Sequence, residues 1–172
     1  MIVNTQDVKH RQARPEEINS AYELLKIAAL RLQAAGVSQW AYWLDPPKYK
    51  RVWLQRGFEN EEYYFLDYQD KVIGMYRLSD TDIDYWGAQT VEARYIHSLV
   101  VLPNYAGQGL GESVIQKVIA DMKEANVYKL RLDCHAGNKK LCLYYKQLGF
   151  QKVGEKQMPH SLNNLYELVM DE

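Results

Sequence analysis

Residues 95–111 read YIHSLVVLPNYAGQGLG, and this stretch decides the expected fold. Its first eight residues are mostly apolar or β-branched, which predicts a strand over 95–102 that ends at Pro103. Glycines at 107, 109 and 111 then lead into residues 109–125, where apolar side chains recur at helical spacing. Such a turn leaves backbone N–H groups aimed at one point, where the helix dipole also favours negative charge. The stretch therefore predicts a site for a phosphate or pyrophosphate.

The segments on either side of this stretch predict a mixed α/β fold. We expect one central mixed sheet flanked by about four helices, because a hairpin implies antiparallel pairing and strand–helix–strand units imply parallel pairing. Residues 79–94 are polar and are expected to form a loop or a distorted edge segment. The remaining expected elements are strands over 8–13, 63–68, 71–78, 129–134, 150–154 and 165–170, and helices from Pro15 to Gly36, over 48–56 and over 138–148.

Length and composition are those of an ordinary globular protein. The chain has 172 residues, so we expect a single domain over residues 1–172. It carries 21 basic and 22 acidic residues, a balance that argues against a nucleic-acid partner. The sequence has neither a signal-peptide pattern nor the run of about 18 apolar residues that spans a bilayer. We expect no membrane association and a cytoplasmic location.

The two cysteines, Cys134 and Cys142, lie eight residues apart. A disulfide between them is not favoured in a protein of this kind. A catalytic thiol is one interpretation of either residue, and a small, partly buried side chain is the favoured one.

Three kinds of nucleotide-binding loop are distinguished by spacing. A P-loop requires Lys and then Ser or Thr after its last glycine, whereas Glu112 follows Gly111 here. A dinucleotide fingerprint requires a third glycine where Glu112 stands, although Asp133 lies about 20 residues further on, as a ribose-binding carboxylate would. This interpretation stays open as an alternative. A turn that only caps the helix is another.

The third kind of loop carries a family resemblance. Residues 99–103, followed by residues 107–111, resemble motif A of the GNAT superfamily of acyl-CoA-dependent N-acyltransferases. The Gln or Arg of that motif is replaced by Ala106. A second block, residues 138–150, resembles the Asn-x6-Tyr-x3-Gly-Phe pattern of motif B, with Asn138 and Tyr145 at its marked positions.

The resemblance implies an N-acetyltransferase that takes acetyl-CoA as co-substrate and needs no metal. In the family, backbone groups of the strand before the turn pair with the pantetheine arm, here at Leu99 and Val101, and the turn amides hold the pyrophosphate. The implied cofactor-binding residues are Leu99, Val100, Val101, Ala106, Gly107, Gln108, Gly109, Leu110, Gly111, Glu112, Asn138 and Tyr145.

The resemblance also implies the catalytic groups. Tyr145 is the expected general acid for the CoA thiolate, and packing on the apolar face of its helix is the alternative. His97 is the expected general base, because it lies two residues before Leu99 and so on the same face of a regular strand. A structural histidine is the alternative, and Glu92, Asp84 and His135 are other candidate bases.

The acceptor is expected to be a small molecule with a primary amine, and a peptide amine is the alternative. Carboxylates and indoles suit a cationic amine, so the candidate substrate-binding residues are Trp40, Trp43, Asp84 and Trp86. The family is often dimeric, so a homodimer is one expected assembly. The competing function class is a module that binds acyl-CoA without catalysis, for which the replacement at Ala106 is the argument.

Overall fold

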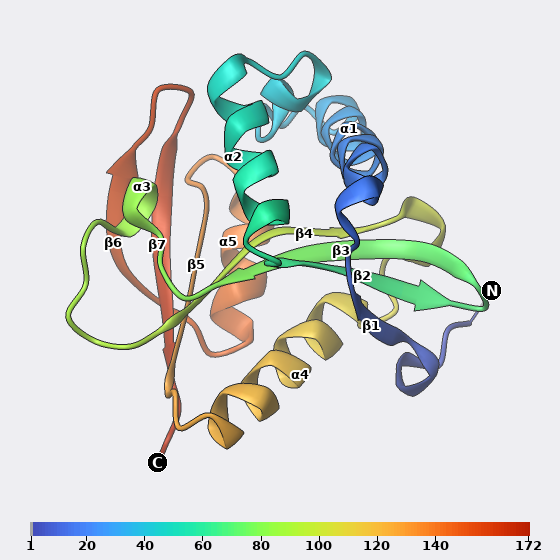
Figure 1. Cartoon of the computed structure of the whole chain (residues 1–172). Coiled ribbons are helices and arrows are strands. Elements are labelled where there is room, and N and C mark those ends of the chain that lie inside the picture. The colour runs from blue at the N-terminus through green and yellow to red at the C-terminus, as the bar shows by residue number, and fades with distance from the viewer. Residues whose placement is uncertain (1) are drawn as a thin grey trace. The chain divides into compact units, whose positions relative to one another are not determined.

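The computed structural model describes residues 2–172, which form helices and a seven-stranded mixed sheet with the strand order β1-β2-β3-β4-β5-β7-β6 (Figure 1). Two compact units are distinguished, Met1–Leu78 with Ser98–Ser113, and Ser79–His97 with Val114–Glu172. The strands are β1 Lys9–Gln12, β2 Tyr63–Tyr68, β3 Lys71–Ser79, β4 Arg94–Val101, β5 Lys129–His135, β6 Gln151–Gln157 and β7 Leu162–Val169. The helices are α1 Ile18–Ala34, α2 Lys48–Glu59, α3 Ile83–Trp86, α4 Leu110–Glu124 and α5 Lys139–Gln147.

In the first unit, β1, β2 and β3 form an antiparallel sheet in which Phe65 stands opposite both Arg11 and Met75. The β2–β3 hairpin is confirmed. Its turn residues Gln69 and Asp70 have φ values of 49° and 60°, the left-handed conformation that a tight hairpin requires and that Asn-Gly adopts more readily. Helices α1 and α2 both lie on one side of this hairpin (Figure 1), and their apolar faces bury Leu25 and Leu54 completely.

Helix α1 begins slightly later than the sequence predicts. Pro15–Glu17 forms one turn of 3-10 helix, and the α-helix starts at Ile18. The Glu17 carboxylate accepts from the backbone N–H of Arg14 and is paired with Arg11 at 2.8 Å. These contacts lower the pKa of the Glu17 carboxyl, and the hydrogen bond from Arg11 has the largest effect. Gly36, with φ at 75°, follows the helix as expected.

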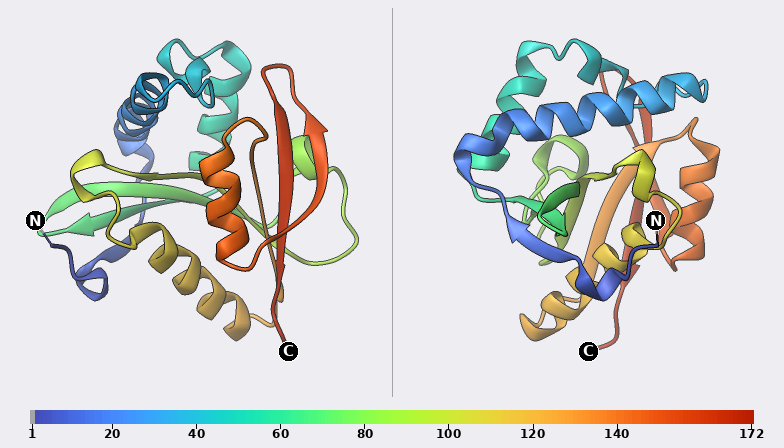
Figure 2. Two further views of the ribbon diagram at one scale, coloured as in Figure 1. Left: turned by 180° about the vertical axis from the view of Figure 1, so that it is seen from behind. Right: turned by 90° about the vertical axis from the view of Figure 1, so that its right-hand side faces the viewer.

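In the second unit, β5 pairs in parallel with β4, with Tyr95 opposite Arg131, and antiparallel with β7, with Leu132 opposite Tyr166. The strand–helix–strand pattern around α5 predicts that β5 and β6 are neighbours, and this expectation is wrong. β7 lies between them, because it contributes the fully buried Tyr166, whereas β6 is largely exposed and carries several charges. A charged strand is suited to the edge of a sheet, where β6 lies (Figure 2).

Residues 79–94 contain one element that the sequence did not predict. The short helix α3 is capped by Asp82, whose Oδ1 accepts from the backbone N–H of Tyr85 at 3.3 Å. The chain therefore has five α-helices among its described residues, where about four were expected. None of these helices has both the length and the apolar character needed to cross a membrane.

Gly74 of β3 permits a close approach to β4. A Cβ atom added at Gly74 would lie 2.4 Å from the carbonyl oxygen of Val100, a backbone atom that cannot swing aside. We predict that Gly74→Ala lowers the free energy of unfolding by about 1–3 kcal/mol, measured by urea denaturation. The matched control is Gly154→Ala in β6, where the added Cβ would meet its nearest neighbour at 3.7 Å. Equal effects of the two substitutions would contradict this account.

Candidate functional site

The glycine turn lies in the first unit, between β4 and α4. Gly107 and Gly109 have φ values of 73° and 79°, a conformation that residues with a Cβ rarely adopt. No atom lies within 4 Å of the Cβ position of either glycine, so the backbone conformation and not crowding requires glycine here. Both are exposed, and α4 begins at Leu110, so its first amides have no acceptor within the helix. The turn has the backbone of an anion site.

The side chains in and around the turn are placed as follows. Leu110 is buried, Ala106, Gln108 and Gly111 are half-buried, and Glu112 is exposed in the first turn of α4. The Gln108 side chain is used within the protein, because its Oε1 accepts from the backbone N–H of Val3 at 2.7 Å. Gln108 is therefore available to a ligand mainly through its backbone.

Strand β4 changes conformation in its middle. Ser98 has a φ of 53°, which interrupts the regular alternation of side chains along the strand. His97 and Leu99 flank this irregular residue, so their spacing of two does not place them on the same face, as it would in a regular strand. Val100 is buried, and Leu99 and Val101 are half-buried. The parallel ladder of β4 with β5 runs from Arg94 to Tyr95.

His97 belongs to the second unit and lies between two carboxylates. Its Nε2 is 2.7 Å from Oδ2 of Asp82, and its Nδ1 is 3.4 Å from Oδ1 of Asp133. The three side chains are only 11%, 5% and 6% exposed. The Tyr85 ring packs on the imidazole, with the ring centroids 5.1 Å apart. The sequence singled out His97 as a base and Asp133 only as a possible ribose-binding carboxylate, and the spacing along the chain gives no sign that Asp82 or Asp133 reaches the imidazole.

The other candidate bases are differently placed. Glu92 is exposed and forms an ion pair with Arg94 at 3.3 Å. Asp84 is exposed on α3. His135, at the end of β5, accepts from the backbone N–H of Gly137 through Nδ1 at 2.9 Å. Among these candidates, His97 is the one that is both largely buried and held between carboxylates.

Tyr145 lies on α5 and is 7% exposed. Its ring packs against Tyr144, Phe150 and Tyr166. Burial raises the pKa of the Tyr145 phenol far above its ordinary value, and the neighbouring Cys134 raises it further. The hydroxyl therefore keeps its proton through the neutral range and is a weaker acid than an exposed phenol.

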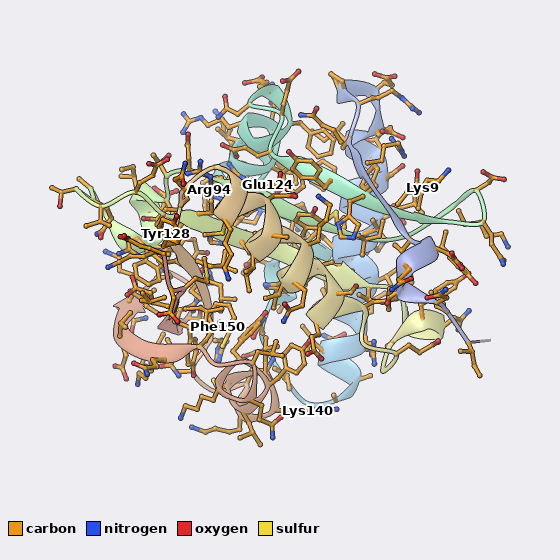
Figure 3. All side chains as sticks on the ribbon, turned by 90° about the horizontal axis from the view of Figure 1, so that it is seen from below. Lys9, Arg94, Glu124, Tyr128, Lys140 and Phe150 are labelled. Carbon is orange, nitrogen blue, oxygen red and sulfur yellow. The ribbon has the colours of Figure 1, made fainter. Side chains whose placement is uncertain are left out.

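The start of α5 and the two cysteines lie in the second unit. Asn138 caps α5, with Oδ1 accepting from the backbone N–H of Leu141 at 3.3 Å, while the following lysines are exposed, as Figure 3 shows for Lys140. Cys134 and Cys142 are buried free thiols with their Sγ atoms 3.6 Å apart. Burial raises the pKa of the Cys134 thiol, so a thiolate nucleophile is disfavoured at this position.

The predicted substrate-binding residues fall in different surroundings. Trp43 is 4% exposed and belongs to the core of the first unit, and Trp40, with a φ of 66°, is half-buried. In the second unit, the half-buried Trp86 packs its ring against Tyr95, and the Arg131 guanidinium lies 4.8 Å from the indole. Arg131 itself is ion-paired with Glu167 at 2.7 Å.

Comparisons with known proteins identify the family. Residues 30–150 match the model of the acetyltransferase (GNAT) family, which is more than half of the chain. The chain therefore belongs to this family. An uncharacterized N-acetyltransferase of Bacillus subtilis, YesJ, is 34% identical over 77 residues, which are 44% of this chain and 43% of that protein. The alignment thus spans less than half of that relative's length.

Solved structures share the fold. A GNAT family acetyltransferase from Listeria monocytogenes superimposes with a TM-score of 0.75 at 23% identity, covering 95% of each chain. AAC(6')-Ib, in complex with ribostamycin and coenzyme A, gives a TM-score of 0.71 at 18% identity, covering 95% of this chain and 93% of that one. At these identities the likeness establishes the fold, and the mixed α/β architecture expected from the sequence is confirmed.

The buried state of Tyr145 leads to a measurable prediction. In a spectrophotometric titration, we expect the folded wild type and Tyr145→Phe to ionise the same number of tyrosines up to about pH 11, because a phenol with a raised pKa does not contribute in that range. In denaturant, the wild type should titrate all 14 tyrosines and the variant one fewer. A difference of one tyrosine between the folded proteins near pH 10 would contradict the burial of the phenol.

Proposed function

We propose that this protein transfers an acetyl group from acetyl-CoA to the primary amine of a small molecule by direct attack within a ternary complex. The observation that carries the proposal is the left-handed glycine turn between β4 and α4 in a chain of the acetyltransferase (GNAT) family. Backbone amides at a helix N-terminus bind phosphate groups without help from side chains. The replacement of Gln or Arg by Ala106 is therefore compatible with CoA binding.

The proposed cofactor contacts are residues of β4 and of the glycine turn, together with Asn138 at the start of α5. We assign the pyrophosphate to the amides of residues 107–111, next to Ala106 and Glu112, and the pantetheine arm to the backbone of residues 99–101. The β4–β5 ladder ends at Tyr95, before Leu99, which supports this assignment. Asn138 keeps its capping role and is proposed as a further cofactor contact. The reaction so described requires no metal, and the absence of one remains part of the proposal.

The proposed chemistry uses one base and one acid. The neutral amine attacks the thioester carbonyl, a C–N bond forms, and the tetrahedral intermediate loses the amine proton to His97. The C–S bond then breaks, and the CoA thiolate takes a proton from the Tyr145 hydroxyl. A phenol is protonated at neutral pH and can donate to the thiolate, and the assignment rests on the motif position of Tyr145, because burial raises its pKa and makes it a weaker acid. Exchange with solvent restores both groups.

The proposed binding residues for the acceptor amine are Trp40, Trp43, Asp84 and Trp86. Indole faces and an exposed carboxylate suit an ammonium group in its approach to the site. The buried Trp43 would act by supporting Trp40, because its own ring is enclosed in the core. AAC(6')-Ib has been solved with ribostamycin and coenzyme A, which supports a small-molecule acceptor, and a peptide amine stays the alternative.

The domain bounds, the cellular location and the assembly are also part of the proposal. We propose a single acetyltransferase domain over residues 1–172, because the family match at 30–150 includes parts of both units. We also propose a cytoplasmic location and no nucleic-acid or membrane partner, and the balance of 21 basic and 22 acidic residues supports the lack of a nucleic-acid partner. A homodimer is the proposed assembly, and the exposed edge strand β6 offers the unpaired backbone that such a contact could use.

The first test is ligand binding. A ligand at 100 times its dissociation constant adds about 2.7 kcal/mol to the free energy of unfolding, which raises the melting temperature by a few degrees. We expect acetyl-CoA to produce this shift in a thermal melt and NAD to produce none. A shift with NAD alone would favour the dinucleotide alternative, and no shift with acetyl-CoA would refute the assignment of the glycine turn.

The second test is catalysis. Among amines that give turnover, we expect Tyr145→Phe to lower kcat by about 100-fold or more, because a positioned general acid contributes at least that much. The KM for acetyl-CoA should change little. Tyr144→Phe, one residue away on the half-buried side of α5, is the matched control and should keep near-normal kcat. Binding of acetyl-CoA without turnover of any amine would favour the non-catalytic module.

A further inference from the structure

Two carboxylate side chains from separate segments, Asp82 and Asp133, meet at His97. Because Tyr95 stands opposite Arg131 in the parallel ladder, the residues two positions further along each strand, His97 and Asp133, come side by side on the same face. Asp82, the residue that caps α3, approaches the ring from its other end. The imidazole therefore has a carboxylate at each nitrogen, at 2.7 Å from Nε2 and 3.4 Å from Nδ1.

The shorter contact determines where the neutral ring carries its hydrogen. A carboxylate only accepts hydrogen bonds, so the 2.7 Å contact requires the hydrogen on Nε2, which donates to Oδ2 of Asp82. Nδ1 is then the nitrogen with the lone pair. Its 3.4 Å separation from the carboxylate oxygen Oδ1 of Asp133 is longer than an ordinary hydrogen bond but close enough for the negative charge to stabilise a proton that arrives there.

We infer that Asp82 is a positioning residue that fixes the tautomer of His97, so that Nδ1 accepts the proton released by the acceptor amine, and that Asp133 stabilises the resulting imidazolium. This inference rests on the proposed function, in which His97 is the base. It goes beyond it by naming the accepting nitrogen and the two residues that select it. Asp82 and Asp133 both contact His97 and act through it.

The orientation of Asp82 is itself fixed. Its Oδ1 accepts from the backbone N–H of Tyr85 at 3.3 Å, while Oδ2 receives the hydrogen of His97. The carboxylate is 5% exposed, and the Tyr85 ring packs on the imidazole. The cap of the short helix α3 and the orientation of the histidine thus depend on one side chain.

Asp133 is held in a similar way from the next strand. Its Oδ2 accepts from Nδ2 of Asn163 in β7 at 2.6 Å, and Oδ1 of Asn163 lies 2.5 Å from the Ser161 hydroxyl. These contacts hold the second oxygen of Asp133 towards Nδ1 of His97. The charge that stabilises the imidazolium therefore has a defined place before the proton arrives, which is what makes such stabilisation effective.

The substitution Asp82→Asn tests the inference because it keeps shape and changes hydrogen-bond direction. The Tyr85 N–H holds the amide oxygen in the capping position, so the amide NH₂ faces Nε2 and donates to it. The ring must then carry its hydrogen on Nδ1, which donates to Asp133. We expect an inverted tautomer and a fall in kcat of at least about 100-fold, as for loss of a general base.

The tautomer is read directly from ¹⁵N chemical shifts of the imidazole, recorded from about pH 5 to 10 so that the neutral ring is captured. His97→Gln assigns the signals among the four histidines. The wild type should show hydrogen on Nε2 and proton uptake at Nδ1, and Asp82→Asn should show the reverse. Asp133→Asn should keep the wild-type tautomer yet still lower kcat, because Asn163 holds its amide oxygen and its NH₂ then occupies the Nδ1 lone pair.

The matched control is Asp121→Asn, which removes an exposed carboxylate of α4 paired with Lys117 and should leave both tautomer and kcat unchanged. A wild-type ring with hydrogen on Nδ1, or an unchanged tautomer in a folded Asp82→Asn, overturns the inference. An inverted tautomer with unchanged kcat overturns the role of Asp82 in catalysis. Loss of activity with a chelator that a divalent cation restores would mean that the three side chains hold a metal instead, and would also overturn it. Absence of turnover by the wild type would instead reject the proposed function, while the ¹⁵N shifts still test the tautomer.

Discussion

The register of β4 against β5 decides which side chains meet in the second unit. With Tyr95 opposite Arg131, the tyrosine hydroxyl receives a hydrogen bond from the Arg131 guanidinium at 2.8 Å, and the same guanidinium pairs with Glu167 of β7 at 2.7 Å. A buried charge is tolerated only when it is paired in this way. A shift of one residue would send Arg131 to the opposite face and separate His97 from Asp133. The polar pairs and the candidate base therefore depend on the same alignment of two strands.

Much of the fold could be predicted because its signals are local. The apolar stripe of α4 and the run of strand-forming residues in β4 are visible in the sequence. So are the residues that end predicted elements, namely Gly36, Pro103 and Gly149. The position of β7 between β5 and β6 could not be predicted by the rule that a strand–helix–strand unit pairs its strands. That outcome depends on which strand better fills a position buried on both sides. β7 fits that position because its Tyr166 is completely buried there, and this burial exists only in the assembled sheet.

The candidate site likewise combines features that have a local sequence signal with features that depend on the folded chain. The glycine turn was predicted because closely spaced glycines before a helix are visible in the sequence. The left-handed conformation of Gly107 and Gly109 was not part of that prediction and appears only in the structure. The partners of His97 were missed because Asp82 precedes a helix of only four residues, which is too short to show a period, and Asp133 reaches the ring only through strand register. The left-handed Ser98 was equally hidden, since serine carries no signal for that conformation.

Position 108 illustrates how closely the turn is tied to the rest of its unit. The backbone of Gln108 lies between the two left-handed glycines, and its side chain accepts the amide hydrogen of Val3, more than a hundred residues earlier in the chain. One residue thus satisfies two unrelated requirements. Substitutions at position 108 are therefore constrained by both requirements. A replacement that suits the turn but lacks a side-chain acceptor of the right length would remove the hydrogen bond that ties the beginning of the chain, at Val3, to the turn.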